Sequence, residues 1–216
     1  MSIDNKNLHI ILASKSERRK EILKREGFDF EIYVPHTEEK DIIGEKYSEE
    51  LVSECAREKA EAAYKELSEG SHSSPVHVVG ASSASAKGFA ESVLTIIVSC
   101  DTVVVNDGVI IGKPKDKDDA KRILKSLSGK RHRVISAVCI CKDGKYHLMS
   151  DTTYVKFRNI SDEEIENYID ERKPYDKAGS YGIQDEKFDF VESIEGSMDN
   201  VMGFPIEKFK EMLCGR

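Results

Sequence analysis

The sequence predicts an α/β protein in which helices flank a mixed sheet. Helical segments are interspersed among strand-like runs along the chain, an order typical of this class. Tight turns at 106–108 and 142–145 join neighbouring strand-like runs as hairpins, and the two strands of a hairpin are antiparallel. These observations favour a mixed sheet over a purely parallel one.

In the first half of the chain, apolar periodicity separates strands from helices. A glycine or proline after a periodic run marks its end. One stretch is rich in Ser, Ala and Gly without periodicity, which indicates a loop. In chain order we expect a buried strand over 8–13, a helix over 17–26 closed by Gly27, a strand over 28–34 ending at Pro35, a helix over about 48–67, a flexible insertion loop over 68–92, and a strand over 94–105.

The second half begins with the Asn-Asp-Gly turn at 106–108, which suits a type I′ hairpin and leads into a short strand. Ser161 precedes three acidic residues, as expected at the start of a helix. We therefore expect a helix over 116–127 stopped by Ser128 and Gly129, two strands within 131–158, a helix over 161–172, a strand near 188–194, and a C-terminal helix from about 206. We interpret residues 1–216 as one domain.

Charge and cysteine content limit the classes of partner. A net charge of −7 disfavours binding to nucleic acid or an anionic membrane, although a small anion needs only a local positive pocket. The five cysteines are scattered without a CxxC pair, which suggests neither a disulfide framework nor a zinc site. No apolar run reaches the roughly 20 residues of a membrane span. We expect a cytoplasmic protein.

The segment "IILASKSERRKEIL" (10–23) places a Ser-Lys-Ser turn and two arginines after an apolar strand. Either an anion lies at this turn, or the turn caps a helix and the arginines face water. Ser14 and Glu17 have the spacing of a capping box, whereas Ser16 would cap a helix that starts at Glu17. In both registers a helix N-terminus with unpaired N–H groups follows the strand.

Lys59 interrupts a stripe of small and apolar residues on the helix over 48–67. A lysine that faces a core is costly unless a counter-ion lies opposite. For one isolated lysine, the alternative of a side chain that reaches solvent at the edge of the stripe is favoured.

Asp101 interrupts "TIIVSCDTVVV", a run that otherwise predicts a strand buried on both faces. A buried aspartate can be hydrogen-bonded scaffolding. A carboxylate in apolar surroundings can instead be a general base or a metal ligand.

Two further segments are candidates for anion binding. Lys113 lies on a short turn between Gly112 and Pro114, suited to a phosphate contact, with a surface hairpin lysine as an equal alternative. The segment "AGSYGIQ" (178–184) offers glycines and the amide of Gln184, as an anion nest, a base-reading loop or a plain turn.

Acidic residues after "YVPHT" include Glu38 and Glu39, which could share a divalent cation with Asp101 or simply be solvated. Together, the candidate cations and carboxylates match the needs of phosphoanhydride hydrolysis.

An ordered set of motifs resembles the Maf family of nucleoside triphosphate pyrophosphatases. The motifs are "LASKSERRKEIL", "AREKA", "CDTVVV" with "GKP", "LSGKRHRV", "AGSYGIQ" and "NVMGFP". They cover nearly the whole chain apart from 68–92. Glu17 stands where the family commonly has Pro.

The resemblance implies two lobes around a central cleft, as in Maf and ITPase-like folds, and a homodimer dependent on Mg²⁺ or Mn²⁺. It implies hydrolysis between the α and β phosphates with release of pyrophosphate. In the implied mechanism, Asp101 accepts a proton from water and shares the metal with Glu39. The implied phosphate-binding residues are Lys59, Lys113, Ser14 and Arg19. The implied selectors of the substrate are Arg18, Thr102 and Gln184.

"DTVVV" and "AGSYGIQ" look like the branch of the family that acts on dTTP and UTP, and the resemblance extends the expected substrates to modified pyrimidine nucleotides. The alternatives are the branch that acts on 7-methyl-GTP and a nucleotide-binding regulator of cell division in which catalysis is incidental.

Overall fold

The computed structural model describes residues 8–36, 40, 42–69, 77–79, 94–185 and 187–214. Its strands are β1 (Leu8–Leu12), β2 (Phe30–Ile32), β3 (His77–Val79), β4 (Leu94–Asn106), β5 (Val109–Ile111), β6 (Arg131–Lys142), β7 (Lys145–Phe157) and β8 (Val191–Glu195). Its helices are α1 (Glu17–Arg25), α2 (Glu49–Ser68), α3 (Lys117–Leu127), α4 (Asp162–Arg172), the 3₁₀ turn η2 (Ala178–Ser180), α5 (Met198–Met202) and α6 (Ile206–Leu213).

The described strands form one mixed sheet in the order β3-β2-β1-β4-β6-β7-β8, with β5 paired to β4. Strand β1 is parallel to both β2 and β4, whereas the other described pairings are antiparallel. The β4–β5 turn has positive φ at Asp107 (50°) and Gly108 (80°), as a type I′ turn requires. The predicted mixed sheet and this hairpin are therefore confirmed.

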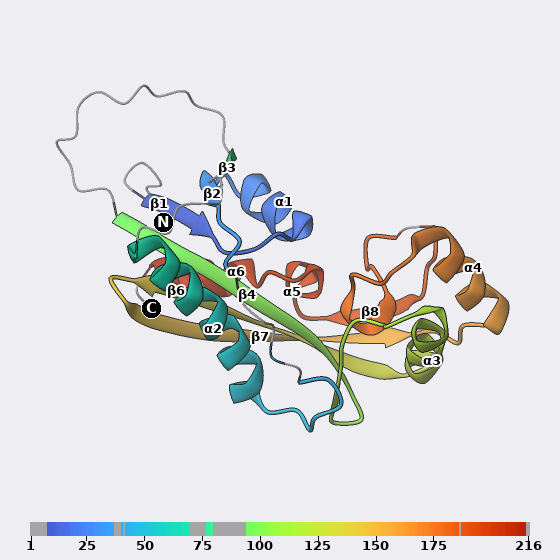
Figure 1. The fold of residues 1–216 in the computed structure, drawn as a ribbon. Coiled ribbons are helices and arrows are strands. Elements are labelled where there is room, and N and C mark those ends of the chain that lie inside the picture. Colours follow the sequence, from blue (N-terminus) through green and yellow to red (C-terminus); the bar gives the residue numbers. More distant parts are fainter. Residues whose placement is uncertain are drawn as a thin grey trace.

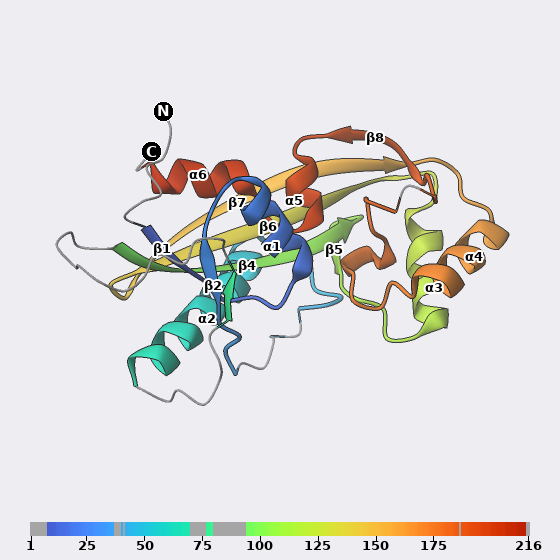
Figure 2. The ribbon, with the colours of Figure 1, turned by 90° about the horizontal axis from the view of Figure 1, so that it is seen from above.

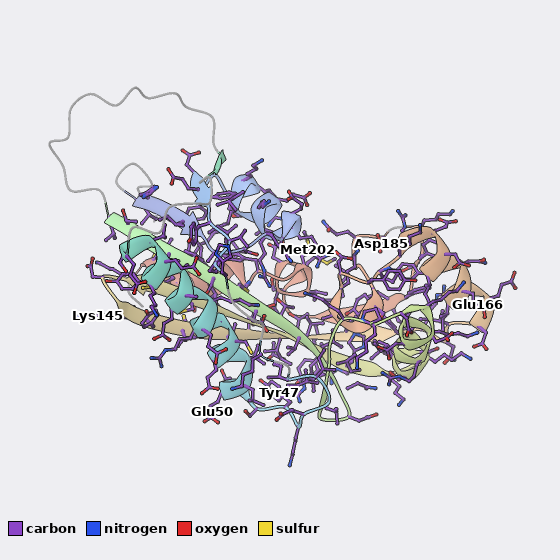
Figure 3. All side chains as sticks on the ribbon, viewed as in Figure 1. Tyr47, Glu50, Lys145, Glu166, Asp185 and Met202 are labelled. Atoms are coloured by element: carbon purple, nitrogen blue, oxygen red, sulfur yellow. The ribbon has the colours of Figure 1, made fainter. Side chains whose placement is uncertain are left out.

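The long strands β4, β6 and β7 run the length of the molecule, and helices cover the sheet in separate groups (Figure 1). Helix α2 lies on one face, while α5 and α6 lie on the other (Figure 2). Helices α3 and α4 pack together at one end. In Figure 3, Lys145 on the β6–β7 hairpin and Glu166 on α4 mark opposite ends of the molecule.

Three buried apolar clusters follow this arrangement. One lies between α2 and the sheet, one between the other face and α1 and α6, and one beneath α3 and α4. Alternate residues of β4 enter different clusters because successive side chains of a strand point to opposite faces. Ile97 and Val103 face α2, whereas Ile96 and Val98 face the opposite layer.

The predicted elements agree with the structure except where an element is very short. Helix α5 has five residues, and strand β3 has three, inside the predicted loop over 68–92. Neither is long enough to show a periodicity of its own. Within that predicted loop, residues 70–76 and 80–92 lie outside the described part of the chain.

Helix α1 begins in one of the two expected registers. Ser16 is its N-cap residue, and the Ser14 hydroxyl accepts a hydrogen bond from the Ser16 N–H at 3.2 Å. Glu17 forms an ion pair with Lys20 at 2.6 Å. The capping-box interpretation of Ser14 and Glu17 is therefore wrong, because Ser14 lies two residues before the N-cap and Glu17 is the first residue of the helix, not the third.

Candidate active site

A cleft of about 650 Å³ opens beside strand β4. Its walls come from the turn before α1, from α2, β4 and the turn after β5, and from the segments 176–184 and 201–203. The structure brings together in it every described residue that the sequence placed in the site: Ser14, Arg18, Arg19, Lys59, Asp101, Thr102, Lys113 and Gln184.

Lys59 and Asp101 form an ion pair inside this cleft. Lys59 Nζ lies 2.5 Å from Asp101 Oδ1, and both side chains are largely buried, with 15% and 18% of their surface exposed. Lys59 lies within the predicted stripe formed by Val52, Cys55, Ala56, Ala60 and Ala63, all of which are buried. The counter-ion that a lysine at this position needs is therefore present.

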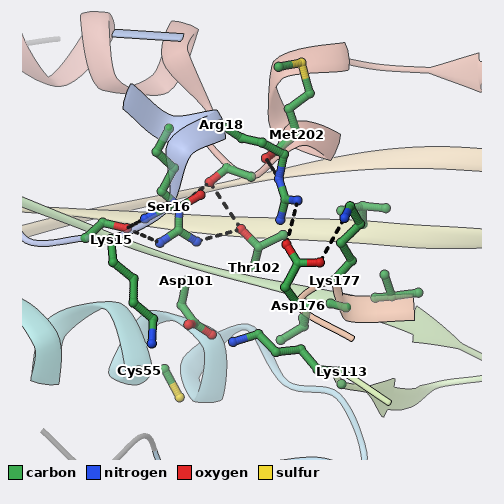
Figure 4. Close-up of a pocket in the computed structure, with 18 of the residues that line it drawn as sticks. Lys15, Ser16, Arg18, Cys55, Asp101, Thr102, Lys113, Asp176, Lys177 and Met202 are labelled. Atoms are coloured by element: carbon green, nitrogen blue, oxygen red, sulfur yellow. Dashed lines mark hydrogen bonds and ion pairs between the residues drawn. The ribbon is translucent and has the colours of Figure 1, made fainter. Parts of the chain in front are cut away.

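Lys59 contacts only one carboxylate oxygen of Asp101, and no donor among the described residues is bonded to the other. Figure 4 shows Asp101 and Lys113 pointing toward each other across the cleft. The neighbouring Cys55 also lines the cleft, but burial and the Asp101 charge raise the pKa of its thiol to about 11. A thiol of this kind is neutral at pH 7, so a carboxylate is the better base here.

Arg19 is held by three parts of the chain. Its Nε donates to the Gly203 carbonyl at 2.8 Å, its Nη1 to Ser14 Oγ at 3.2 Å, and its Nη2 to Thr102 Oγ1 at 3.3 Å. A guanidinium has five N–H donors, so two remain after these bonds to described residues. The side chain is fixed in the cleft wall and can still grip an anion.

Arg18 reaches across the mouth of the cleft. Its Nε donates to the Met202 carbonyl at 3.3 Å, and its Nη1 lies 3.5 Å from Asp176 Oδ2 (Figure 4). Asp176 also contacts Lys177 at 2.8 Å. Burial raises the pKa of Asp176, but Lys177 and Arg18 outweigh it, and the net pKa lies below its usual value.

Lys113 and the segment 178–184 are joined through their backbones. The Gly179 N–H donates to the Gly112 carbonyl at 3.1 Å, next to Lys113. Gly179 has φ +73°, and a Cβ there would lie 2.8 Å from Val104 Cγ2. Position 179 therefore requires glycine. The close approach that glycine allows puts the segment that carries Gln184 and the turn that carries Lys113 on the same wall of the cleft.

The sequence interpretation missed several residues that line the cleft. They are Lys15, Lys40, Glu58, Asp176 and Lys177. Lys15 lies inside the segment 10–23, in the turn between the strand and the helix, where a solvated lysine is common. Asp176 directly precedes "KAGSYGIQ", and only the chain path after α4 carries it to Arg18. No local pattern distinguishes it from a solvated aspartate.

The cleft is locally basic on an acidic chain. Among its described lining residues, seven are cationic and four are anionic: Lys15, Arg18, Arg19, Lys40, Lys59, Lys113 and Lys177 against Glu17, Glu58, Asp101 and Asp176. The whole chain carries a net charge of −7. This contrast concentrates small anions at the cleft.

Asp101 on β4 and Glu58 on α2 are carboxylates that line the cleft. Glu39, the other expected metal ligand, lies outside the described residues. Within the described ranges, no group of three His, Cys, Asp or Glu side chains is arranged to hold a metal ion. Mg²⁺ is commonly held by one or two carboxylates together with substrate phosphates, so this donor set fits such a cation.

All five cysteines are described and carry free thiols. No helix in the described ranges is both long and apolar enough to cross a membrane.

Comparison with known proteins places this geometry in context. Residues 9–216 match the family model described as Maf, Maf-like protein. A protein of Bdellovibrio bacteriovorus named dTTP/UTP pyrophosphatase is 37% identical over 206 residues, which cover 94% of this chain and 96% of that protein. Proteins of the same name from Chromobacterium violaceum (39%; 95% and 93% covered) and Thermosipho africanus (40%; 97% and 94% covered) are equally similar.

Proposed function

This chain belongs to the Maf family, and we propose that it hydrolyses dTTP and UTP to the monophosphate and pyrophosphate. The observation that carries the proposal is the Lys59–Asp101 pair, which faces Arg18, Arg19 and Lys113 in one basic cleft. A basic cleft alone would bind a nucleotide. A carboxylate with an available oxygen adds a group that can take a proton from water.

In the proposed mechanism, the triphosphate lies between the cations on the two walls. Arg19 donates its two remaining N–H groups to phosphate oxygens, and Lys113 contributes a point charge from the opposite wall. Ser14 Oγ already accepts two hydrogen bonds, so its own proton is left to donate to a phosphate oxygen. These contacts orient the α-phosphate and stabilise the charge that develops on the leaving group.

Asp101 acts as the general base. Lys59 binds Oδ1 and fixes the direction of the carboxylate, while the other oxygen accepts a proton from the attacking water. The water oxygen forms a bond to the α-phosphorus, the bond to the bridging oxygen breaks, and pyrophosphate leaves. A divalent cation, Mg²⁺ or Mn²⁺, held by Asp101 and by Glu39 or Glu58, would neutralise phosphate charge.

Arg18, Thr102 and Gln184 are the proposed selectors of the nucleotide. All three line the cleft beside the phosphate-binding residues, so a bound nucleotide would reach them with its sugar or base. We further propose a cytoplasmic homodimer without nucleic-acid or membrane partners. The five free thiols are compatible with a reducing compartment, and light scattering after size exclusion measures the oligomeric state.

The decisive experiment is a nucleotide panel of dTTP, UTP, CTP and 7-methyl-GTP, with pyrophosphate and orthophosphate measured separately. We expect pyrophosphate from dTTP and UTP with Mg²⁺ or Mn²⁺, and no turnover with a chelator. Preferential turnover of 7-methyl-GTP would assign the chain to the other branch. Binding without turnover of any nucleotide would favour a regulatory protein.

A further inference from the structure

A chain of hydrogen bonds runs from Arg19 into the core behind the cleft. Arg19 Nη2 contacts Thr102 Oγ1 at 3.3 Å, Thr102 Oγ1 contacts Ser136 Oγ at 2.9 Å, and Ser136 Oγ contacts the Asn200 carbonyl at 2.9 Å. Ser136 is fully buried on β6, directly opposite Thr102 in the β4–β6 pairing. These hydrogen bonds therefore connect the wall of the cleft to Ser136, a buried residue that does not line the cleft.

The direction of each hydrogen bond in this series follows from which groups can donate and which can only accept. The Asn200 carbonyl can only accept, so the single proton of Ser136 is donated to it. Ser136 then receives a bond from Thr102 as an acceptor. Among the described residues, the Gly203 carbonyl, at 3.3 Å, is a second acceptor for the Thr102 hydroxyl. Whether Thr102 donates to Ser136 or to Gly203, its proton points into the protein and not into the cleft.

This direction determines what Thr102 can do in the cleft. The Thr102 hydroxyl donates its one proton within the protein. One lone pair of Oγ1 accepts a hydrogen bond from Arg19, and the second lone pair remains available to a ligand. A ligand group that contacts the hydroxyl must therefore donate a hydrogen bond to it. Thr102 also acts as a fixed acceptor that orients the Arg19 guanidinium.

The end of the chain is anchored by Asn200. Its Nδ2 donates to the Val134 carbonyl and to Thr153 Oγ1, each at 3.0 Å, and the residue is fully buried. These bonds hold the short helix α5 against β6 and β7. The carbonyls of Met202 and Gly203 at the end of α5 accept from Arg18 and Arg19, which gives the "NVMGFP" motif a structural role.

We propose that Ser136 is a positioning residue of the anion site. Ser136 Oγ accepts a hydrogen bond from the Thr102 hydroxyl, and the hydroxyl oriented in this way holds Arg19 in the geometry that grips a phosphate. The identity of the anion as a nucleotide triphosphate rests on the proposed function, whereas the positioning of Arg19 does not.

A double-mutant cycle tests this coupling. The variants are Ser136→Ala, Thr102→Val and the pair together, and the probe is inorganic tripolyphosphate, with its Kd measured by calorimetry. Each single variant is expected to raise Kd about two- to tenfold, the range of one hydrogen bond. Because Ser136 acts through Thr102, the double variant should match Thr102→Val alone. Thr102→Ser keeps the hydroxyl and should raise Kd less than Thr102→Val does.

Ser99→Ala is the matched control. Ser99 is also fully buried on a central strand and also donates to a backbone carbonyl, that of Ala56, but on the opposite face of the sheet. It should lower the midpoint of urea unfolding without changing Kd for tripolyphosphate. If Ser136→Ala does not fold, Ser136→Cys, which keeps a weaker donor and acceptor, takes its place and should raise Kd by less than Thr102→Val does.

Three results would overturn the proposal: an unchanged Kd in Ser136→Ala, multiplicative effects in the double variant, or a wild-type protein that does not bind tripolyphosphate. Failure of the proposed function has a different signature. In that case tripolyphosphate binds, the cycle shows the expected coupling, and no nucleotide in the panel is hydrolysed.

Discussion

Lys59 Nζ and Asp101 Oδ1 lie 2.5 Å apart and connect helix α2 to strand β4 inside the cleft. The two residues are 42 positions apart in the sequence. Each is costly to bury alone, and together they satisfy one another. The pair thus explains how a lysine inside a small-residue stripe and an aspartate inside a buried strand are tolerated at the same place.

Replacing Asp101 with Asn should reduce pyrophosphate release from dTTP about 10²–10⁴-fold, because the amide cannot accept a proton from water. The shape of the side chain is retained, so far-ultraviolet circular dichroism should be unchanged, although the uncompensated Lys59 should lower the unfolding midpoint. Asp143→Asn, at an exposed hairpin turn, is the control and should retain full activity. Normal turnover by the Asp101 variant would exclude this carboxylate as the base.

The sequence predicted those parts of the site in which a side chain breaks a local pattern. Lys59 and Asp101 stand out because each interrupts an apolar run, and Arg18 and Arg19 because they follow a strand directly. Their partners could not be identified in this way. The Gly203 carbonyl is a backbone group with no signature in the sequence, and only the fold brings it to Arg19.

The same limit explains the missed elements. Helix α5 has five residues and is positioned by the side chain of Asn200 rather than by an apolar stripe. Asp176 meets Arg18 only because the chain returns to the cleft after α4. Long-range placement of this kind depends on topology, whereas periodicity reports only local structure.

Replacing Glu17 with Pro should leave activity within about twofold of the wild type. Glu17 is the first residue of α1, where proline is favoured and no intrahelical N–H bond is lost. Its carboxylate pairs with Lys20 and is 77% exposed. The kcat and KM for dTTP provide the measurement. A large rise in KM would show that the charge or the N–H group of Glu17 contributes to the site.

His132 should make the fold sensitive to mild acid. Burial lowers the pKa of its imidazole from 6.5 to about 4, so the folded state favours the neutral form. The stability contributed by this group is complete above pH 6.5 and is lost as the pH falls toward 4, by about 3 kcal/mol in total. The unfolding free energy in urea between pH 7.5 and 4 measures this loss.

His132→Gln provides the comparison, since the amide can still donate to Tyr181 Oη, which lies 2.9 Å from His132 Nε2. Carboxylates titrate in both proteins and cancel in the difference. The stability advantage of the wild type should therefore shrink as the pH falls. Parallel curves for the two proteins would show that His132 does not titrate in this range.

Gly179→Ala should both destabilise the fold and weaken substrate binding. The new Cβ would lie 2.8 Å from Val104 Cγ2 at φ +73°, so the segment 178–184 must move away from β4. We expect a loss of about 1–3 kcal/mol in the free energy of unfolding. Because this segment carries Gln184 and is joined to the Lys113 turn, KM for dTTP should rise.

Gly27→Ala separates backbone strain from the steric clash. Gly27 has φ +78°, almost the same as Gly179, but no described atom lies within 4 Å of its hypothetical Cβ. It should cost only about 1 kcal/mol and leave KM unchanged, because it lies after α1 and outside the cleft. Equal losses of stability in the two variants, with KM unchanged in both, would mean that the close approach of Gly179 to β4 does not position the cleft wall.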